Sequence, residues 1–218
     1  MGRAIEAAVT AADDLEPAGI WTRGASLDDV VATADVLIDF SLPEAHADVL
    51  AAIRKQPIPL VCGVSGLDSE QVASMQSLAN DLPVLFDRNM SQGIAVLHDA
   101  VTRIAAALGD EFAVEIHETH HVHKLDSPSG TALKLAEAVA AGRGQDPAAA
   151  DIKFEVERRG EVPGDHTVVL ASATERLSLN HSVTTRDVFV AGALRAARWL
   201  VAQEPGFYDM RNVLFDAQ

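Results

Sequence analysis

Short apolar runs alternate with helical patterns along the first part of the chain. The apolar runs cover residues 36–40, 59–62 and 84–86. Between them, residues 43–55 and 68–79 carry the spacing of amphipathic helices. Strands that alternate with helices predict a parallel sheet covered by helices, and therefore an α/β fold.

The pattern changes in the second part of the chain. Residues 91–108 carry the clearest apolar stripe of a helix, a strand-like run follows at 112–117, and residues 130–141 return to helical spacing, with Gly142 where a C-cap would stand. We then expect an open, mostly antiparallel sheet and one last helix. The runs concerned are 153–157, 167–171 and 176–181 for the strands and 188–202 for the helix.

Composition excludes several classes of protein. A formal net charge of −15 repels nucleic acid, because binding to its backbone depends on Lys and Arg. No stretch is apolar enough for a signal peptide or a membrane span. Cys62 is the single cysteine among 218 residues, which excludes an internal disulfide and indicates a reducing compartment, so we expect a cytoplasmic protein.

The densest polar motif is ETHHVHKLDSPSGT at residues 118–131, which we expect to form one loop between a strand and a helix. Histidine passes protons near neutral pH, and Lys124 beside it can hold an anion, so the motif suits a carboxylate substrate. Ser129, Gly130 and Thr131 open the next helix, where free backbone N–H groups can bind a second carboxylate. The alternative is simple N-capping by Ser129 or Thr131.

The histidines also permit a metal site, since four imidazoles lie within seven residues. Adjacent His120 and His121 would point in opposite directions on a strand, and no nearby Cys completes a tetrahedral set, so we expect no metal. Four other histidines are expected to be satisfied surface or core residues. They are His46, His98, His166 and His181.

Residues 118–132 match the motif E-x-H-H-x-x-K-x-D-x-P-S-G-T-A at every defined position, and in this the chain resembles the 4-hydroxy-tetrahydrodipicolinate reductase family. The resemblance implies that His120 is the proton donor and Lys124 the second catalytic group. It assigns substrate binding to the start of the following helix and two further positions. These residues are His121, Ser129, Gly130, Thr131 and Arg186.

Other segments resemble the family in the same order: IDFSLPE from residue 38, GVSG from residue 63 and NMS from residue 89. GVSG follows a predicted strand end, where α/β sheets usually bind ligands, although its glycines could mark only a turn. Through these segments the resemblance implies a cofactor site. Its residues are Met1, Gly2, Arg23, Phe40, Gly63, Val64, Ser65, Asp87, Arg88, Asn89 and Met90.

The chain departs from the family pattern at its beginning. It opens at Met1-Gly2-Arg3, which matches only the end of the family's glycine-rich turn, so we expect a misassigned start or a fragment, and alternatively a short form without ordinary cofactor binding. The strand that precedes this turn in the family is also absent from the sequence. Loss of this central strand should expose a hydrophobic slot. Trp21, Thr22 and Arg23 stand where a carboxylate would bind a ribose hydroxyl, so Arg23 favours NADPH over NADH.

The sequence therefore predicts a Rossmann-like dinucleotide-binding domain at 1–90 and 187–218, and an α+β substrate domain with an open mixed sheet at 91–186. The resemblance implies NAD(P)H-dependent reduction of (2S,4S)-4-hydroxy-2,3,4,5-tetrahydrodipicolinate to tetrahydrodipicolinate in lysine and diaminopimelate biosynthesis. It also implies a small dicarboxylate substrate and a homotetramer formed through the substrate-domain sheet. The alternatives are a non-catalytic dicarboxylate-binding relative and a metal-dependent hydrolase that uses the histidine cluster.

Overall fold

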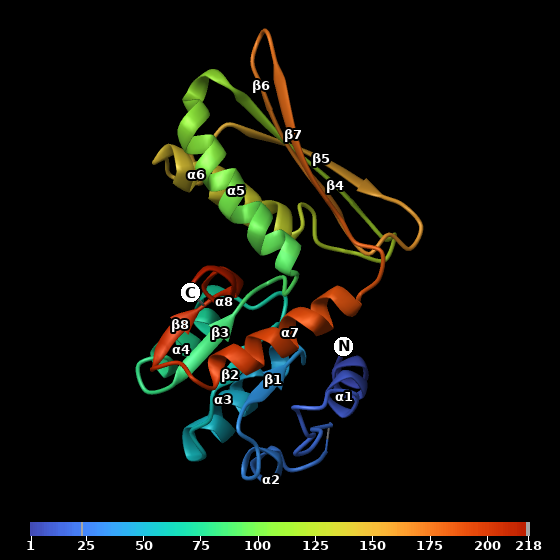
Figure 1. The fold of residues 1–218 in the computed structure, drawn as a ribbon, viewed down its shortest axis with the longest axis vertical. Coiled ribbons are helices and arrows are strands. Elements are labelled where there is room, and N and C mark those ends of the chain that lie inside the picture. The colour runs from blue at the N-terminus through green and yellow to red at the C-terminus, as the bar shows by residue number, and fades with distance from the viewer. Residues whose placement is uncertain (23, 217–218) are drawn as a thin grey trace. The chain divides into compact units, whose positions relative to one another are not determined.

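The computed structural model describes residues 1–22 and 24–216 and divides into two compact units (Figure 1). The first unit combines the chain up to Gln92 with the chain from Asp187 onward, and the second is Gly93–Arg186. The first boundary lies two residues after the one expected at 90. The chain therefore leaves the first unit once, builds the second, and returns.

The first unit is built on a parallel four-stranded sheet, which confirms the predicted α/β fold. Its strands are β1 (Leu37–Asp39), β2 (Leu60–Cys62), β3 (Pro83–Phe86) and β8 (Gly206–Tyr208), in the order β1-β2-β3-β8. The register places Asp39 beside Cys62 at the carboxyl ends of β1 and β2.

Helices cover this sheet on both faces. The helix α7 (Asp187–Leu200) crosses one face in contact with β1, β2 and β3, and α1 (Gly2–Thr10) packs against it. Figure 1 shows α3 and α4 on the other side of the sheet. On that side, the short 3-10 helix η1 (Pro43–Ala45) leads directly into α3 (His46–Lys55). The other helices there are α4 (Ser69–Leu78) and α2 (Leu27–Val31), which neighbours α3.

The ends of the chain hold structure that the sequence pattern did not predict. No element was expected in α1 or α2, and the apolar tail forms β8 and then α8 (Met210–Phe215). Asp209 caps α8 with its carboxylate, and the N–H of Met210 donates to Asp87 at 3.3 Å. The tail is therefore part of the first sheet and its cover.

The second unit contains a mixed sheet in the order β5-β4-β6-β7. The central strand β4 pairs in parallel with β5 and antiparallel with β6, and β6 pairs antiparallel with β7. These pairings agree with the predicted open mixed sheet. The strands are β4 (Ala113–His120), β5 (Ile152–Arg158), β6 (Asp165–Ala171) and β7 (Arg176–Ser182).

Two helices cover one face of this sheet: α5 (Gln92–Leu108), which continues into η2 (Gly109–Glu111), and α6 (Gly130–Arg143). Gly142 does not end α6, as its position suggested. It lies inside the helix, where a Cβ atom would collide with the Thr102 carbonyl of α5. The C-cap is Gly144, with a left-handed φ of 66°. Gly142 thus permits the close approach of two helices.

Within the part of the chain that the structure describes, none of the helices combines the length and the apolar character that a membrane crossing demands.

Candidate active site

The strand β4 brings Glu118 and His120 onto one buried face of the second sheet. Buried and partly exposed residues alternate along β4, so Val114, Ile116, Glu118 and His120 all point towards α5 and α6. The expectation that residues 118–131 form a single loop was therefore wrong at its start. Pairing with strands on both sides keeps β4 extended as far as His120.

A third buried group joins this pair from the neighbouring strand. His166 of β6 lies opposite Glu118 in the antiparallel register, and its ring centroid lies 5.0 Å from that of His120 in an edge-on arrangement. Burial, and secondarily the charge of His120, lowers the pKa of His166 to about 3. His166 was expected to be an ordinary histidine, and the sequence offered no signal that it lies in this cluster.

Glu118 is the centre of the buried cluster. Its side chain has 0% exposure, and its two oxygens accept the N–H of Ser129 at 3.0 and 3.2 Å. The Arg158 guanidinium approaches Oε1 at 3.4 Å and also donates to the Lys124 and Asp126 carbonyls. A buried carboxylate needs such partners, and these partners fix the loop that follows β4.

The charge state of His120 reflects its surroundings. Burial lowers its pKa below 6.5, the Glu118 carboxylate opposes this shift, and the Lys124 and Arg158 charges add to it. Nδ1 of His120 lies 3.6 Å from Oε2 of Glu118, just beyond hydrogen-bonding distance. A Cβ atom at Gly164 would lie 3.1 Å from Nε2, so the absence of a side chain there leaves room beside the ring.

Lys124 and the start of α6 form an anion site that an internal carboxylate already uses. Nζ of Lys124 lies 2.8 Å from Asp126, whose pKa is lowered because the hydrogen bond and charge of Lys124, with the Gly130 N–H, outweigh the opposing effect of burial. Ser129 caps α6 by accepting the Ala132 N–H. We had expected the backbone N–H of Ser129 to be free for a ligand. It is not free, because it donates to Glu118.

The remaining predicted substrate residues lie at different depths. Thr131 is buried at the first turn of α6, next to half-buried Gly130. His121 is half-buried after β4, with its ring 6.2 Å from that of His123. Arg186 is exposed in the turn before α7. The structure thus gathers His120, Lys124 and the start of α6, and adds Glu118, Arg158 and His166 to them.

The predicted cofactor residues belong to the first unit. Phe40 and Gly63 follow β1 and β2, and the Phe40 ring packs where a Gly63 side chain would stand. Since α/β sheets bind ligands at the carboxyl ends of their strands, Phe40 and Gly63 lie where such a fold holds a dinucleotide. Arg23 lies outside the described residues. The other predicted residues are spread over α1 and the segments after β2 and β3. They are buried Val64, Asp87 and Met90, half-buried Met1 and Asn89, and exposed Gly2, Ser65 and Arg88.

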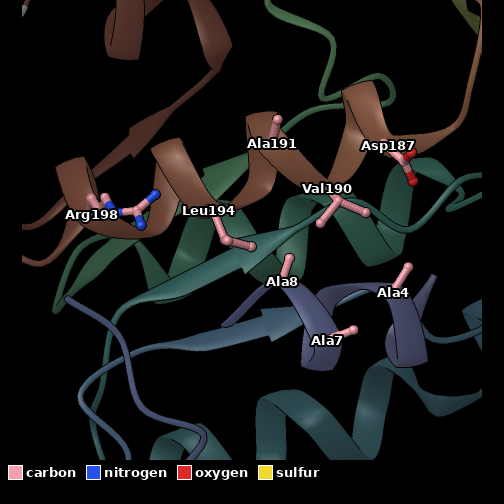
Figure 2. Close-up of a pocket in the computed structure, with 8 residues that line it drawn as sticks. All are labelled: Ala4, Ala7, Ala8, Asp187, Val190, Ala191, Leu194 and Arg198. Atoms are coloured by element: carbon pink, nitrogen blue, oxygen red, sulfur yellow. The ribbon is translucent and has the colours of Figure 1, made fainter. Parts of the chain in front are cut away.

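The first unit also has an apolar groove of about 710 Å³ between α1 and α7 (Figure 2). Three alanines of α1 face the apolar side chains of α7, and Asp187 and Arg198 lie at its two ends. The groove contains none of the buried titratable groups of the second unit. Its lining suits packing rather than catalysis.

Comparison with known proteins gives consistent matches over both units. The family model "Dihydrodipicolinate reductase, N-terminus" matches residues 1–90, and "Dihydrodipicolinate reductase, C-terminus" matches residues 93–214. A 4-hydroxy-tetrahydrodipicolinate reductase from Alkalilimnicola ehrlichii is 41% identical over 93% of this chain and 83% of its own length. One from Halorhodospira halophila is 40% identical over 91% and 82%.

A solved structure shares the fold. It is a dipicolinate-bound dihydrodipicolinate reductase from Paenisporosarcina sp. TG-14, with a TM-score of 0.75 and 21% sequence identity. The match covers 97% of this chain and 94% of that one.

Proposed function

This chain belongs to the dihydrodipicolinate reductase family, and from this premise we propose which of its residues carry out the reaction. It is an NAD(P)H-dependent oxidoreductase that reduces (2S,4S)-4-hydroxy-2,3,4,5-tetrahydrodipicolinate to tetrahydrodipicolinate, with loss of water, in lysine and diaminopimelate biosynthesis. The proposal rests above all on one observation, the buried placement of His120 beside Glu118, where the Lys124 charge also acts on its pKa.

His120 is the general acid. The nicotinamide cofactor supplies a hydride when it is bound, and His120 delivers the proton that the reduced carbon skeleton needs. Burial lowers the pKa of the free imidazole, which makes its protonated form a stronger acid. A dianionic substrate next to His120 would raise this pKa again and keep the proton available in the complex.

Lys124 and the start of α6 bind the substrate carboxylates. In the free protein the Asp126 carboxylate contacts Lys124 and the Gly130 N–H, so it stands in for an anionic group at this position. A substrate carboxylate takes its place, with Ser129, Gly130, Thr131, His121 and Arg186 as further contacts. The match with a dipicolinate-bound reductase supports a small dicarboxylate as the ligand.

The first unit holds the cofactor. Phe40 with Gly63 to Ser65 would hold the nicotinamide, and Met1 and Gly2 at the start of α1 would hold the phosphates. The segment from Asp87 to Met90 completes the contacts. Arg23 favours the 2′-phosphate of NADPH, and a comparison of kcat/KM for NADPH and NADH in the wild type and in R23A would test this preference.

We also propose that the enzyme is a cytoplasmic homotetramer. The single cysteine suits a reducing compartment. In the second unit, β5 and β7 are edge strands, and Val156 and Leu177 are exposed on them. Such a sheet offers edges and a face for pairing between copies. Light scattering tests the assembly, and a monomer at micromolar concentration would contradict it.

Substitution of the general acid is the direct test. H120Q should lower kcat by about 10²–10⁴-fold while the Kd for dipicolinate changes little. H117Q is the matched control, because His117 belongs to the same strand but to the opposite, partly exposed face. An H120Q enzyme with wild-type kcat would remove His120 from its proposed role.

A further inference from the structure

A second group of buried polar side chains lies in the first unit, where two of its members directly precede Phe40 and Gly63 of the proposed cofactor site. It consists of Asp39 at the end of β1, Cys62 at the end of β2 and His46 at the start of α3. One ligand atom of each lies within 4.8 Å of those of the other two. The exposures are 5% for Asp39, 2% for His46 and 0% for Cys62.

The parallel register brings these residues together. Asp39 and Cys62 are cross-strand neighbours, so their side chains leave the sheet on the same face. This is the face that α3 covers, because Cys62 packs with Val49, Leu50 and Ile53 of that helix. The first residue of α3 is His46, and its imidazole therefore lies over the strand ends.

The unsatisfied atoms of Asp39 and His46 are both acceptors. Nε2 of His46 lies 3.1 Å from the Gln71 carbonyl, so it carries the ring proton and leaves a lone pair on Nδ1. Oδ1 of Asp39 accepts the Ser41 N–H at 2.8 Å. Among the described residues, no hydrogen-bond donor reaches Nδ1 of His46 or Oδ2 of Asp39. Two unsatisfied buried acceptors thus lie in one group with a thiol, whose single hydrogen can serve only one of them, so the arrangement is costly unless a cation binds there.

We propose that Asp39, His46 and Cys62 form a binding site for a divalent metal ion of the zinc type. Carboxylate, imidazole and thiolate are the three ligand classes that Zn²⁺ combines in proteins. Histidine ligands usually donate their second N–H to a carbonyl or carboxylate, as His46 does to Gln71. Gln71 is itself fixed, because it forms the capping box of α4 with Asp68 and donates to the Pro43 carbonyl.

The distances fit such an ion after a small contraction. Bonds of about 2.0–2.3 Å in a tetrahedral site separate the ligand atoms by about 3.4–3.7 Å. The side chains would need to close by roughly 1 Å from the present limit of 4.8 Å. Burial, and secondarily the Asp39 charge, raises the pKa of the Cys62 thiol to about 12, so the metal must displace its proton. A water or small anion takes the fourth position.

The other group of this kind, Glu118 with His120 and His166, is a poorer metal site. Its carboxylate oxygens already accept the Ser129 N–H and face the Arg158 charge. Among the described residues, the hydrogen-bond partners of Asp39, His46 and Cys62 are uncharged backbone groups.

Cobalt titration followed by absorption tests the proposal on the full chain. Metal-free protein is loaded with Co²⁺ during refolding, since the site is buried. Because Cys62 is the only cysteine in the sequence, a cobalt–thiolate charge-transfer band in the near ultraviolet can come from no other residue. We expect one equivalent of Co²⁺ to produce the band, Zn²⁺ to remove it, and C62S to lack it.

Two further variants distinguish a site of three ligands from metal binding by the Cys62 thiol alone. H46Q should weaken Co²⁺ binding at least tenfold, whereas H117Q, in the second unit, should leave it unchanged. Zn²⁺ should also raise the melting temperature of the wild type but not that of C62S, and circular dichroism confirms that each variant is folded. A wild-type protein without the band, or an H46Q variant with wild-type Co²⁺ affinity, would overturn the proposal. The three side chains would then be a buried group that shares a proton rather than a metal ion.

Discussion

Replacing Glu118 by glutamine keeps the shape of this buried side chain and removes its charge. The amide oxygen can still accept the Ser129 N–H, so the cap of α6 should survive. The Arg158 guanidinium, however, loses the carboxylate that it approaches at 3.4 Å. The variant therefore isolates the electrostatic role of Glu118 from its hydrogen-bonding role.

The expected loss of stability follows from these contacts. Breaking a buried ion pair typically costs about 3–5 kcal/mol. Arg158 keeps the Lys124, Asp126 and Glu157 carbonyls as acceptors, so we expect about 3 kcal/mol, the lower end of that range. The protein should remain folded at 25 °C, because domains have a margin of about 5–15 kcal/mol.

The expected effect on catalysis has a different signature. Glu118 raises the pKa of His120 against the effect of burial, so E118Q should lower that pKa further. If His120 must be protonated in the free enzyme, kcat/KM falls as pH rises through this pKa, and each unit of decrease removes about tenfold of the activity at neutral pH. The descending limb of the pH profile should move to lower pH.

Urea unfolding and the pH dependence of kcat/KM measure the two effects. E115Q is the matched control, since Glu115 lies on the same strand but on its partly exposed face. It should change neither quantity. An E118Q enzyme with wild-type stability and an unmoved pH limb would refute the role that we give to Glu118.

Three other predictions concern His166, Gly63 and Asp126. His166 has a pKa of about 3 in the folded protein and near 6.5 when unfolded, so the unfolded state binds more protons below pH 6.5. The free energy of unfolding should therefore fall by about 2 kcal/mol from pH 6.5 to 5. Urea titrations should show this loss in the wild type but not in H166Q. G63A should cost about 1–3 kcal/mol by displacing the Phe40 ring, while G2A, with open space around it in α1, should cause no loss in thermal unfolding. D126N should tighten dipicolinate binding by up to about fivefold in calorimetry, because it removes an internal competitor from a partly exposed pair; weaker binding would show that Asp126 supports the site instead.

The sequence predicted the fold class and the main helices because their apolar periods are long and regular. It placed the end of β4 wrongly because residues 118–120 are polar, and only pairing with β5 and β6 keeps them extended. Gly142 looked like the end of a helix because glycine is common there. Its actual role is to make room for the Thr102 carbonyl of another helix, a contact that the sequence does not show.

The candidate site was predicted where its residues are contiguous and missed where they are distant. His120, Lys124 and Ser129 fall within one motif, whereas Arg158 and His166 reach them only through the register of β5 and β6. The same holds for Asp39 and Cys62, which lie on different strands and meet only in the sheet. Sequence spacing reports contacts within an element, and pairing between elements decides the rest.

The order of the strands has a consequence for synthesis of the chain. The second unit is one continuous segment, Gly93–Arg186, and all of its sheet partners are present once that segment has been made. The first unit must wait, because β3 pairs with β8 and the sheet is covered by α7, both of which come after residue 186. The part of the protein that leaves the ribosome first is therefore the last to be completed.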